Sequence, residues 1–204
     1  GVLMTLITSA VSVTRQRMAI TEGKATQREI GRAIMQYVED HDGMLPGPMT
    51  PSTIIRRPAG PLGEGQTLVQ RIGEYIGADQ VPVGEIVRRF ANKEYLRKTD
   101  NDPTIPHYWM FFNLRVDEDR FTGECPWGYP GHAAHARPMS YFTINRPAFQ
   151  IILKDNDRML IDTERPHGWP PPGGLPKPVY GDVRNVLYFD GHVETEPHSE
   201  VKVR

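Results

Sequence analysis

The chain of 204 residues is poor in several features that usually guide a functional assignment. It has one cysteine, Cys125, which excludes an internal disulfide. Its 24 Lys and Arg residues are balanced by 25 Asp and Glu residues, without the clustered basic excess of a typical nucleic-acid-binding protein. We therefore expect no nucleic acid as a specific partner.

Signatures of catalysis are also missing. The chain has neither a G-x-S-x-G nucleophile elbow nor a recognisable catalytic-cysteine signature. Residues 60–67 (GPLGEGQT) have the spacing of a phosphate loop, but Gln66 replaces the lysine that contacts phosphate. His132 and His135 form an H-x2-H pair, whereas a zinc site needs three or four convergent ligands. We expect no enzymatic activity and no catalytic or cofactor-binding residue, and we interpret Cys125 as a small packed residue.

Metal ligands are not assigned either. The acidic clusters at residues 100–102, 117–119 and 155–157 contain oxygen ligands of the type that calcium prefers. None of them has the D-x-D-x-D-G order of an EF-hand loop. Turn formation between strands explains the clusters without a metal, and calcium binding stays open as an alternative.

Charge is absent from the first segment of the chain, residues 1–14 (GVLMTLITSAVSVT), and begins abruptly at Arg15. Fourteen helical residues rise only about 21 Å, less than the roughly 30 Å hydrocarbon core of a bilayer, so this segment cannot span a membrane alone. It also lacks the basic region and cleavage site of an intact signal peptide. Two interpretations remain, a buried core helix or the downstream half of a longer apolar helix.

A single long helix is predicted for residues 1–41, which contain no proline, and Gly43 and Pro46 predict its end. Its last turns have an apolar stripe with helical spacing, formed by Ile30, Ala33, Ile34, Tyr37 and Val38. Residues 15–29 are mostly polar and, if helical, would hold the apolar end about 20 Å away from the head. This gradient is typical of a helix that leaves a head domain and enters a hydrophobic bundle.

Residues 43–204 are predicted to form a globular head rich in turns, because the chain contains 19 Gly and 19 Pro. We expect a Pro/Gly-rich connection at 43–66, a short helix at 66–76 capped by Gly77, a second helix at 85–97, and an irregular loop at 164–181. Strands are predicted at 107–116, 140–145, 149–153 and 159–162.

The strongest local signal lies in residues 185–195 (NVLYFDGHVET), where two β-rich runs flank the dipeptide Asp190-Gly191. This pattern predicts a β-hairpin with a two-residue type I′ turn, in which both central residues have positive φ.

Four segments carry a resemblance to a known family. They are residues 1–10, residues 28–46 (REIGRAIMQYVEDHDGMLP), Cys125-Pro126 with the later Ser140-Tyr141 and Asn145, and residues 185–194 (NVLYFDGHVE). In this order they resemble the bacterial pilin-like proteins that have a prepilin-type N-terminal methylation segment and a carboxy-terminal H-X9-DG region. Tyr180 stands ten residues before Asp190, where the family has histidine, and His167 is the candidate for its displaced counterpart. By this resemblance, the first dozen or so mature residues of the family, including a glutamate used in assembly, are missing here.

The resemblance implies an α+β fold, with a long N-terminal helix (residues 1–42) packed on a small antiparallel β-sheet head (43–204). It also implies that the chain is the structural subunit of an extracellular helical filament similar to a type IV pilus. Such a subunit is a homopolymer that is inserted in the inner membrane before assembly and lies on the cell surface afterwards. The residues expected to bury one another in the filament are Val2, Leu3, Leu6, Ile7, Ala10, Val11 and Val13.

Two other functions stay open. A minor pseudopilin of a type II secretion system would use the same helix and sheet, but it would be short-lived and periplasmic. A membrane-anchored binding protein would instead capture a ligand with the loops at residues 43–66 and 164–181.

Overall fold

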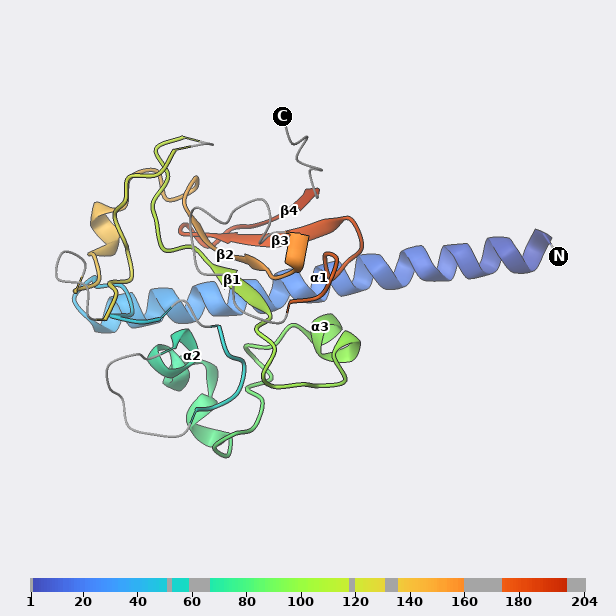
Figure 1. Cartoon of the computed structure of the whole chain (residues 1–204), viewed down its shortest axis with the longest axis horizontal. Coiled ribbons are helices and arrows are strands. Elements are labelled where there is room, and N and C mark those ends of the chain that lie inside the picture. Colours follow the sequence, from blue (N-terminus) through green and yellow to red (C-terminus); the bar gives the residue numbers. More distant parts are fainter. Residues whose placement is uncertain are drawn as a thin grey trace.

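A computed structural model describes residues 2–50, 53–58, 67–117, 120–130, 136–159 and 174–197, and for residues 2–9 it describes the backbone alone. The helix α1 (Val2–Asp40) runs along the whole length of the molecule, and the rest of the chain gathers around its C-terminal part (Figure 1). The fold is α+β, with this long N-terminal helix and a four-stranded antiparallel sheet.

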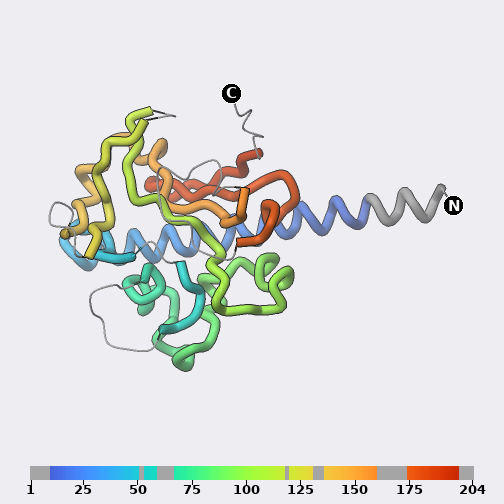
Figure 2. The backbone as a smooth tube through the Cα atoms, viewed as in Figure 1, coloured from blue at the N-terminus to red at the C-terminus, as the bar shows by residue number. Residues whose placement is uncertain are grey.

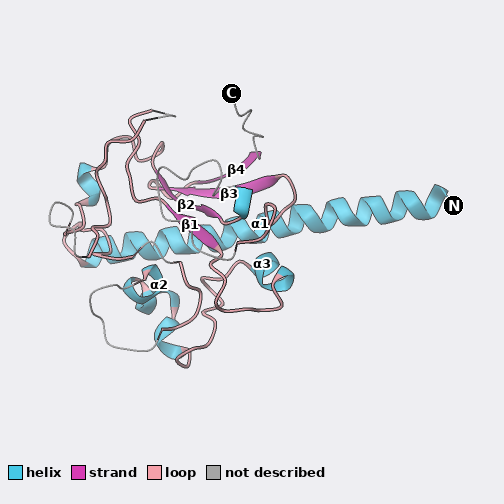
Figure 3. Ribbon diagram, viewed as in Figure 1, coloured by secondary structure: helices cyan, strands magenta, loops and turns pink. Residues whose placement is uncertain are grey.

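The sheet consists of β1 (Tyr108–Met110), β2 (Ile151–Asp155), β3 (Val183–Tyr188) and β4 (Val193–Pro197). The strands follow the order β1-β2-β3-β4, and all neighbours are antiparallel. Contacts of β3 and β4 with α1 place the sheet along the helix (Figure 3). The C-terminal part of α1 is therefore one layer of a helix-on-sheet sandwich.

Both faces of the sheet are buried at β3. Asn185 and Leu187 face α1, where Leu187 joins Ile30 and Ile34 in the main core. On the opposite face, Val186 and Tyr188 pack with Trp109, Phe111 and Ile151 in a second apolar cluster. Because successive side chains of a strand point to opposite faces and both faces are covered here, residues 186–188 of β3 are apolar without alternation.

Short helices complete the head. These are α2 (Leu68–Arg71), the 3-10 helices η1 (Gly73–Ile76) and η2 (Ala78–Gln80), α3 (Lys93–Lys98) and the 3-10 helix η4 (Tyr141–Thr143). In the view of Figure 3, α2 and α3 lie on the opposite side of α1 from the sheet. Both η1 and α3 contact α1, which is therefore enclosed from two sides in its C-terminal part.

The long helix predicted at residues 1–41 is confirmed. It ends where Asp42 and Gly43 adopt φ angles of 52° and 80°, and the Gly43 N–H donates to the Val38 carbonyl at 2.9 Å. This is a helix C-cap in the left-handed conformation, which glycine adopts at little cost. In the tube drawing, α1 runs through the head and ends at the side opposite its exposed part (Figure 2).

The other helices are shorter than the sequence predicted. The helix expected at 66–76 is divided at Ile72 into α2 and η1, and Gly77 caps the second piece with a φ of 69°. The helix expected at 85–97 is wrong in its first half, because the Val87 N–H donates to the Ile55 carbonyl and fixes that segment in extended backbone pairing. Only α3 is helical there, and it begins where the Asn92 side chain accepts from the Glu94 and Tyr95 N–H groups.

Of the strand predictions, the one at 140–145 is wrong and the one at 107–116 is too long. Tyr141–Thr143 form the 3-10 helix η4 there, after Ser140 pairs with Met44 in an isolated bridge and the chain turns. The strand expected at 107–116 is reduced to β1, although the Phe111 N–H still donates to the Ile152 carbonyl at 3.0 Å. The strand at 149–153 is confirmed as β2, shifted by two residues. Met159 lies in a helical turn, and the rest of the strand predicted at 159–162 falls outside the described residues.

The hairpin β3–β4 is confirmed, but its turn is of another type. Gly191 has a φ of 84°, whereas Asp190 does not have a positive φ, so the predicted type I′ turn is wrong. The Gly191 N–H donates to the Tyr188 carbonyl at 2.9 Å, and the Tyr188 N–H donates to the His192 carbonyl at 3.1 Å. This pattern is a three-residue loop, Phe189 to Gly191, with a left-handed glycine in a bulge. The Phe189 side chain is buried in the core, so this residue belongs to the loop rather than to the strand ladder. The loop therefore has three residues instead of two.

Candidate functional site

The part of α1 that leaves the head is the most unusual surface of the molecule. Every side chain from Ala10 to Met18 is exposed, over two and a half turns of helix. Val11 is 45% exposed, Val13 47% and Met18 62%, so these apolar side chains contact water on an otherwise regular helix. A helix without a partner surface has little stability of its own, so this stretch is suited to packing against something else.

The side chains predicted for assembly divide into two groups. Ala10, Val11 and Val13 are exposed, as an intermolecular contact requires. The backbone of the others lies in the same helix, and their side chains fall outside the described part of the chain; they are Val2, Leu3, Leu6 and Ile7. Across the described residues, no helix combines the length and apolar character needed to cross a membrane.

The contact between α1 and the head begins earlier than the sequence predicted. Gly23 and Gln27 are buried, so the segment 15–29 does not hold the head about 20 Å from the apolar end, and that expectation is wrong. A Cβ atom on Gly23 would overlap the Tyr180 hydroxyl and would lie 2.9 Å from the Asn185 Nδ2. Glycine thus allows the helix to approach the head closely at this point.

A network of five buried or nearly buried polar side chains, centred on Asp155 and called the Asp155 network below, fixes α1 to the head. The Asp155 Oδ1 accepts from the Gln27 Nε2 at 3.2 Å and from the Asn92 Nδ2 at 3.0 Å, and its Oδ2 accepts from the Asn185 N–H at 2.7 Å. The Asn92 Nδ2 also donates to the Tyr180 hydroxyl at 2.7 Å. One carboxylate therefore connects α1, the start of α3, and the strands β2 and β3.

The electrostatics of the network are set by burial. Burial raises the pKa of Asp155 from 3.8 to about 7, although the hydrogen bonds from Asn185, Asn92 and Gln27 act in the opposite direction. Nearby, the His107 Nδ1 accepts from the Asn92 N–H at 3.0 Å, and burial lowers the pKa of His107 to about 3. His107 is therefore neutral, and it accepts a hydrogen bond at the start of α3 while Asp155 binds Gln27 of α1.

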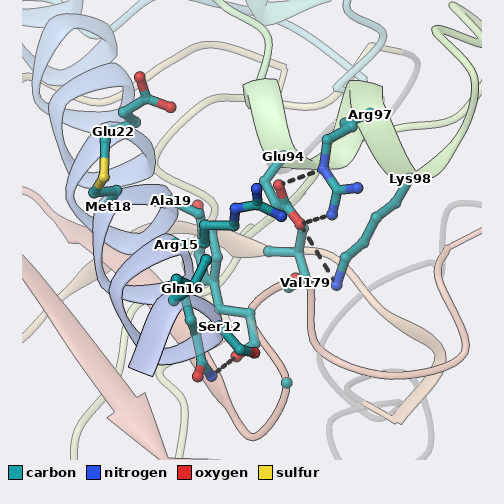
Figure 4. A pocket seen from close by; sticks show the side chains of 13 residues that line it. Ser12, Arg15, Gln16, Met18, Ala19, Glu22, Glu94, Arg97, Lys98 and Val179 are labelled. Carbon is teal, nitrogen blue, oxygen red and sulfur yellow. Dashed lines mark hydrogen bonds and ion pairs between the residues drawn. The ribbon is translucent and has the colours of Figure 1, made fainter. Parts of the chain in front are cut away.

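A groove lies where α1 leaves the head, and we call it the junction groove. Its volume is about 920 Å³, and its walls come from α1, from α3 and from the segment before β3 (Figure 4). The α1 side contributes Val11, Arg15 and Met18, and the α3 side contributes Arg97 and Lys98. On the remaining wall, the Gln16 side chain donates to the Tyr180 carbonyl and connects the exposed helix to the head.

The other groups considered from sequence do not assemble into a site in the described part of the chain. Cys125 is buried, and burial raises the pKa of its thiol, as expected of a packed residue. Asp155 belongs to the network, and Asp157 forms an ion pair with Arg184, so the cluster at 155–157 is used structurally. No group of three or more His, Cys, Asp or Glu side chains that could hold a metal occurs among the described residues. His132, His135, His167 and residues 60–66 lie outside them.

Sequence reasoning missed the Asp155 network and the junction groove. Asp155 was interpreted as part of a turn, and Tyr180 only as a departure from the family pattern. Gly23 was the one available signal, since a glycine inside a helix often marks a close approach of another segment.

No protein-family model, curated protein or solved structure matches this chain. The α+β fold therefore rests on the structure of this chain alone. Membership of the pilin-like family stays a prediction.

Proposed function

We propose that this chain is the structural subunit of a helical, pilin-like filament, in which the N-terminal part of α1 packs against the same part of other copies. The observation that carries the proposal is the continuous exposure of Ala10 to Met18, a stretch that overlaps the uncharged segment of residues 1–14. An apolar helix held out in water is unfavourable, and burial in a bundle of identical helices removes it from water.

Burial of these side chains would supply a large part of the free energy of assembly. Each fully buried Val, Leu or Ile contributes about 1.5–3 kcal/mol. Six such residues in 1–14 thus supply on the order of 10 kcal/mol per subunit before the entropy of association is subtracted. They are Val2, Leu3, Leu6, Ile7, Val11 and Val13.

The Asp155 network supports the proposal through geometry. In a helical filament, the same symmetry operation relates every subunit to the next one. The head must therefore have one fixed orientation relative to the packed helix. The Gln27 Nε2 of α1 donates to Asp155 of β2 and to the Asn185 carbonyl of β3, and Asp155 in turn accepts from Asn92 at the start of α3. The helix and the head therefore present one surface to every neighbour.

The proposal places the subunit in the inner membrane before assembly and in an extracellular filament afterwards, with no catalytic role. A short-lived pseudopilin of a secretion system would assemble through the same helix. Abundance of the native protein on the cell surface separates the two: a surface filament is expected to be abundant there, and a periplasmic pseudopilus is not.

The substitution Leu6→Asp tests the proposal, because it places an unpaired charge among apolar helices. We expect the variant to form no filaments by electron microscopy, while the head keeps its melting temperature. Thr21→Asp is the matched control, since it adds the same charge to an exposed position of α1 four turns further along. Normal filaments from Leu6→Asp, or equal loss in both variants, would contradict the proposal.

A further inference from the structure

The junction groove carries an excess of positive charge. Arg97 and Lys98 share one carboxylate, that of Glu94, at 2.5 Å and 3.8 Å. Arg15 reaches into the same groove from α1, and no carboxylate of the described residues lies within ion-pair distance of it (Figure 4). Glu22, the other acid on the wall, pairs with Lys93 at 3.5 Å. The groove therefore suits an anionic occupant.

The groove also offers apolar surface. Val11 and Met18 line it, and they are 45% and 62% exposed. An occupant that combines carboxylates with one large apolar side chain would satisfy both features. A small inorganic anion would leave these two side chains in water.

The chain itself has a surface of this kind at the far end of α1. The last turn of α1 contains Glu39 and Asp40 but no basic residue, and Asp42 follows it. A helix C-terminus has partial negative charge, so three acids there repel the helix and one another. Asp40 accepts from the Tyr75 hydroxyl at 2.8 Å, and no Lys, Arg or His of the described residues forms an ion pair with any of the three.

An apolar side chain lies beside these acids. Phe142 is 80% exposed, and its ring lies over Gly43, where a Cβ atom would come within 2.5 Å of the ring carbon Cε2. We call Glu39, Asp40, Asp42 and Phe142 the acidic end. It matches the groove in both respects, because carboxylates meet cations and an exposed ring meets exposed Val11 and Met18.

The two surfaces of one chain cannot meet. Arg15 and Glu39 are 24 residues apart on one helix, which corresponds to about 36 Å. We propose that the acidic end of one copy docks in the junction groove of the next copy. The inference rests on the proposed filament and specifies a second contact within it, outside the apolar segment. Such a contact is head-to-tail and repeats without closing.

Disulfide cross-linking of the full-length chain tests the docking directly. In a chain with both Arg15→Cys and Glu39→Cys, the two thiols cannot pair within one molecule, because a disulfide needs Cα atoms closer than about 7 Å. Cys125 is buried and stays in place. We expect oxidation of the assembled protein to give a ladder of dimers, trimers and longer multimers that disappears on reduction. Arg17→Cys with Glu39→Cys is the matched control, since Arg17 is exposed on α1 but does not line the groove.

The absence of a ladder, a ladder of equal intensity in the control, or a single closed dimer would each overturn the docking. Electron microscopy of the unmodified chain separates this failure from failure of the proposed function. Filaments without the ladder overturn the docking and leave the filament proposal in place. Absence of filaments under every condition overturns the proposed function, and the docking with it.

Charge exchange gives a second test that does not depend on cysteine. Arg15→Glu and Glu39→Lys are each expected to raise the concentration for half-maximal assembly by about threefold or more, because each places like charges in contact. A 1:1 mixture of the two variants is expected to restore assembly, since each mutated groove then meets a mutated acidic end of opposite charge. A mixture that assembles no better than either variant alone would overturn the docking.

Discussion

At Gly23 the backbone of α1 comes so close to Tyr180 that a methyl group would overlap its hydroxyl. Replacement by alanine must move α1 or the tyrosine, and overpacking of this type lowers stability by about 2 kcal/mol. We expect Gly23→Ala to show this loss in urea unfolding. Gly31→Ala is the control, because its nearest neighbour is the flexible Leu187 side chain at 3.1 Å, and alanine is favoured over glycine in a helix. Equal stability of the two variants would refute the close approach.

Asp155 makes the stability of the fold depend on pH. Its pKa rises from 3.8 in the unfolded chain to about 7 in the folded one, so the folded state binds the proton more tightly. The contribution of this group is fully present below pH 4 and is lost as the pH rises through about 7, on the order of 4 kcal/mol in total. Urea unfolding at several pH values measures it as the difference between the native chain and Asp155→Asn. A difference that does not change between pH 4 and pH 7 would contradict the assignment.

His107 acts in the opposite direction over much of the same range. Its pKa falls from 6.5 in the unfolded chain to about 3 in the folded one, so its contribution is present above pH 6.5 and is lost as the pH falls toward 3. The two groups therefore offset each other in the native chain. We expect His107→Gln, which keeps an acceptor for the Asn92 N–H, to lose stability with rising pH more steeply than the native chain does. The same slope in both proteins would show that His107 is not buried in its neutral form.

Among the elements, the β3–β4 hairpin has a single position that requires glycine. Gly191 has a φ of 84°, and nothing lies within 4 Å of the place where a Cβ atom would be. The penalty for Gly191→Val is therefore conformational, and we expect a loss of about 1–2 kcal/mol in the free energy of unfolding. Gly191→Asn is the matched variant and should lose less, because asparagine tolerates the left-handed region. Equal losses in the two variants would point to a steric cause instead.

The same elements show how far the sequence alone determines the structure. The end of α1 and its buried stripe from Ile30 to Val38 were predictable, because apolar side chains recur there at helical spacing. The earlier contacts of Gly23 and Gln27 were not, since neither side chain is apolar and both depend on partners distant in the chain. The hairpin was predictable from Asp190-Gly191, but its loop type depends on the burial of Phe189, which is a tertiary effect.

The candidate site also has one part that the sequence reveals and one part that it does not. The uncharged segment that contains Val11 and Val13 was visible in the sequence, but their exposure was not, because a buried core helix has the same composition. The junction groove was not visible either, because its walls come from α1 and α3, which are about eighty residues apart in the sequence. Periodicity within one segment carries no information on such a juxtaposition.

For the whole molecule, the structure predicts that the apolar segment and the head are separable. Contacts of α1 with the head begin at Gln16, so a chain shortened to residues 15–204 keeps the Asp155 network and the core. We expect this chain to be folded and monomeric by analytical ultracentrifugation, with the melting temperature of the native head. Filaments formed by the shortened chain would contradict the assembly role of residues 1–14. Loss of the fold would show instead that the segment packs on its own head.

The continuity of α1 also has a mechanical consequence. One unbroken helix joins the exposed segment to the head and lies along the sheet (Figure 1). Gln27 of this helix is hydrogen-bonded to Asp155 of β2 and to the Asn185 carbonyl of β3. A force that pulls the head away from a packed helical bundle acts parallel to the helix axis. The contacts of α1 with β3 and with the Asp155 network are then loaded in shear, so all of them must break together before the head detaches. Contacts at a hinge would instead break one after another under the same force. In a filament built from such subunits, tension would be carried both by the continuous backbone of each α1 helix and by the packing of that helix in the core of its head.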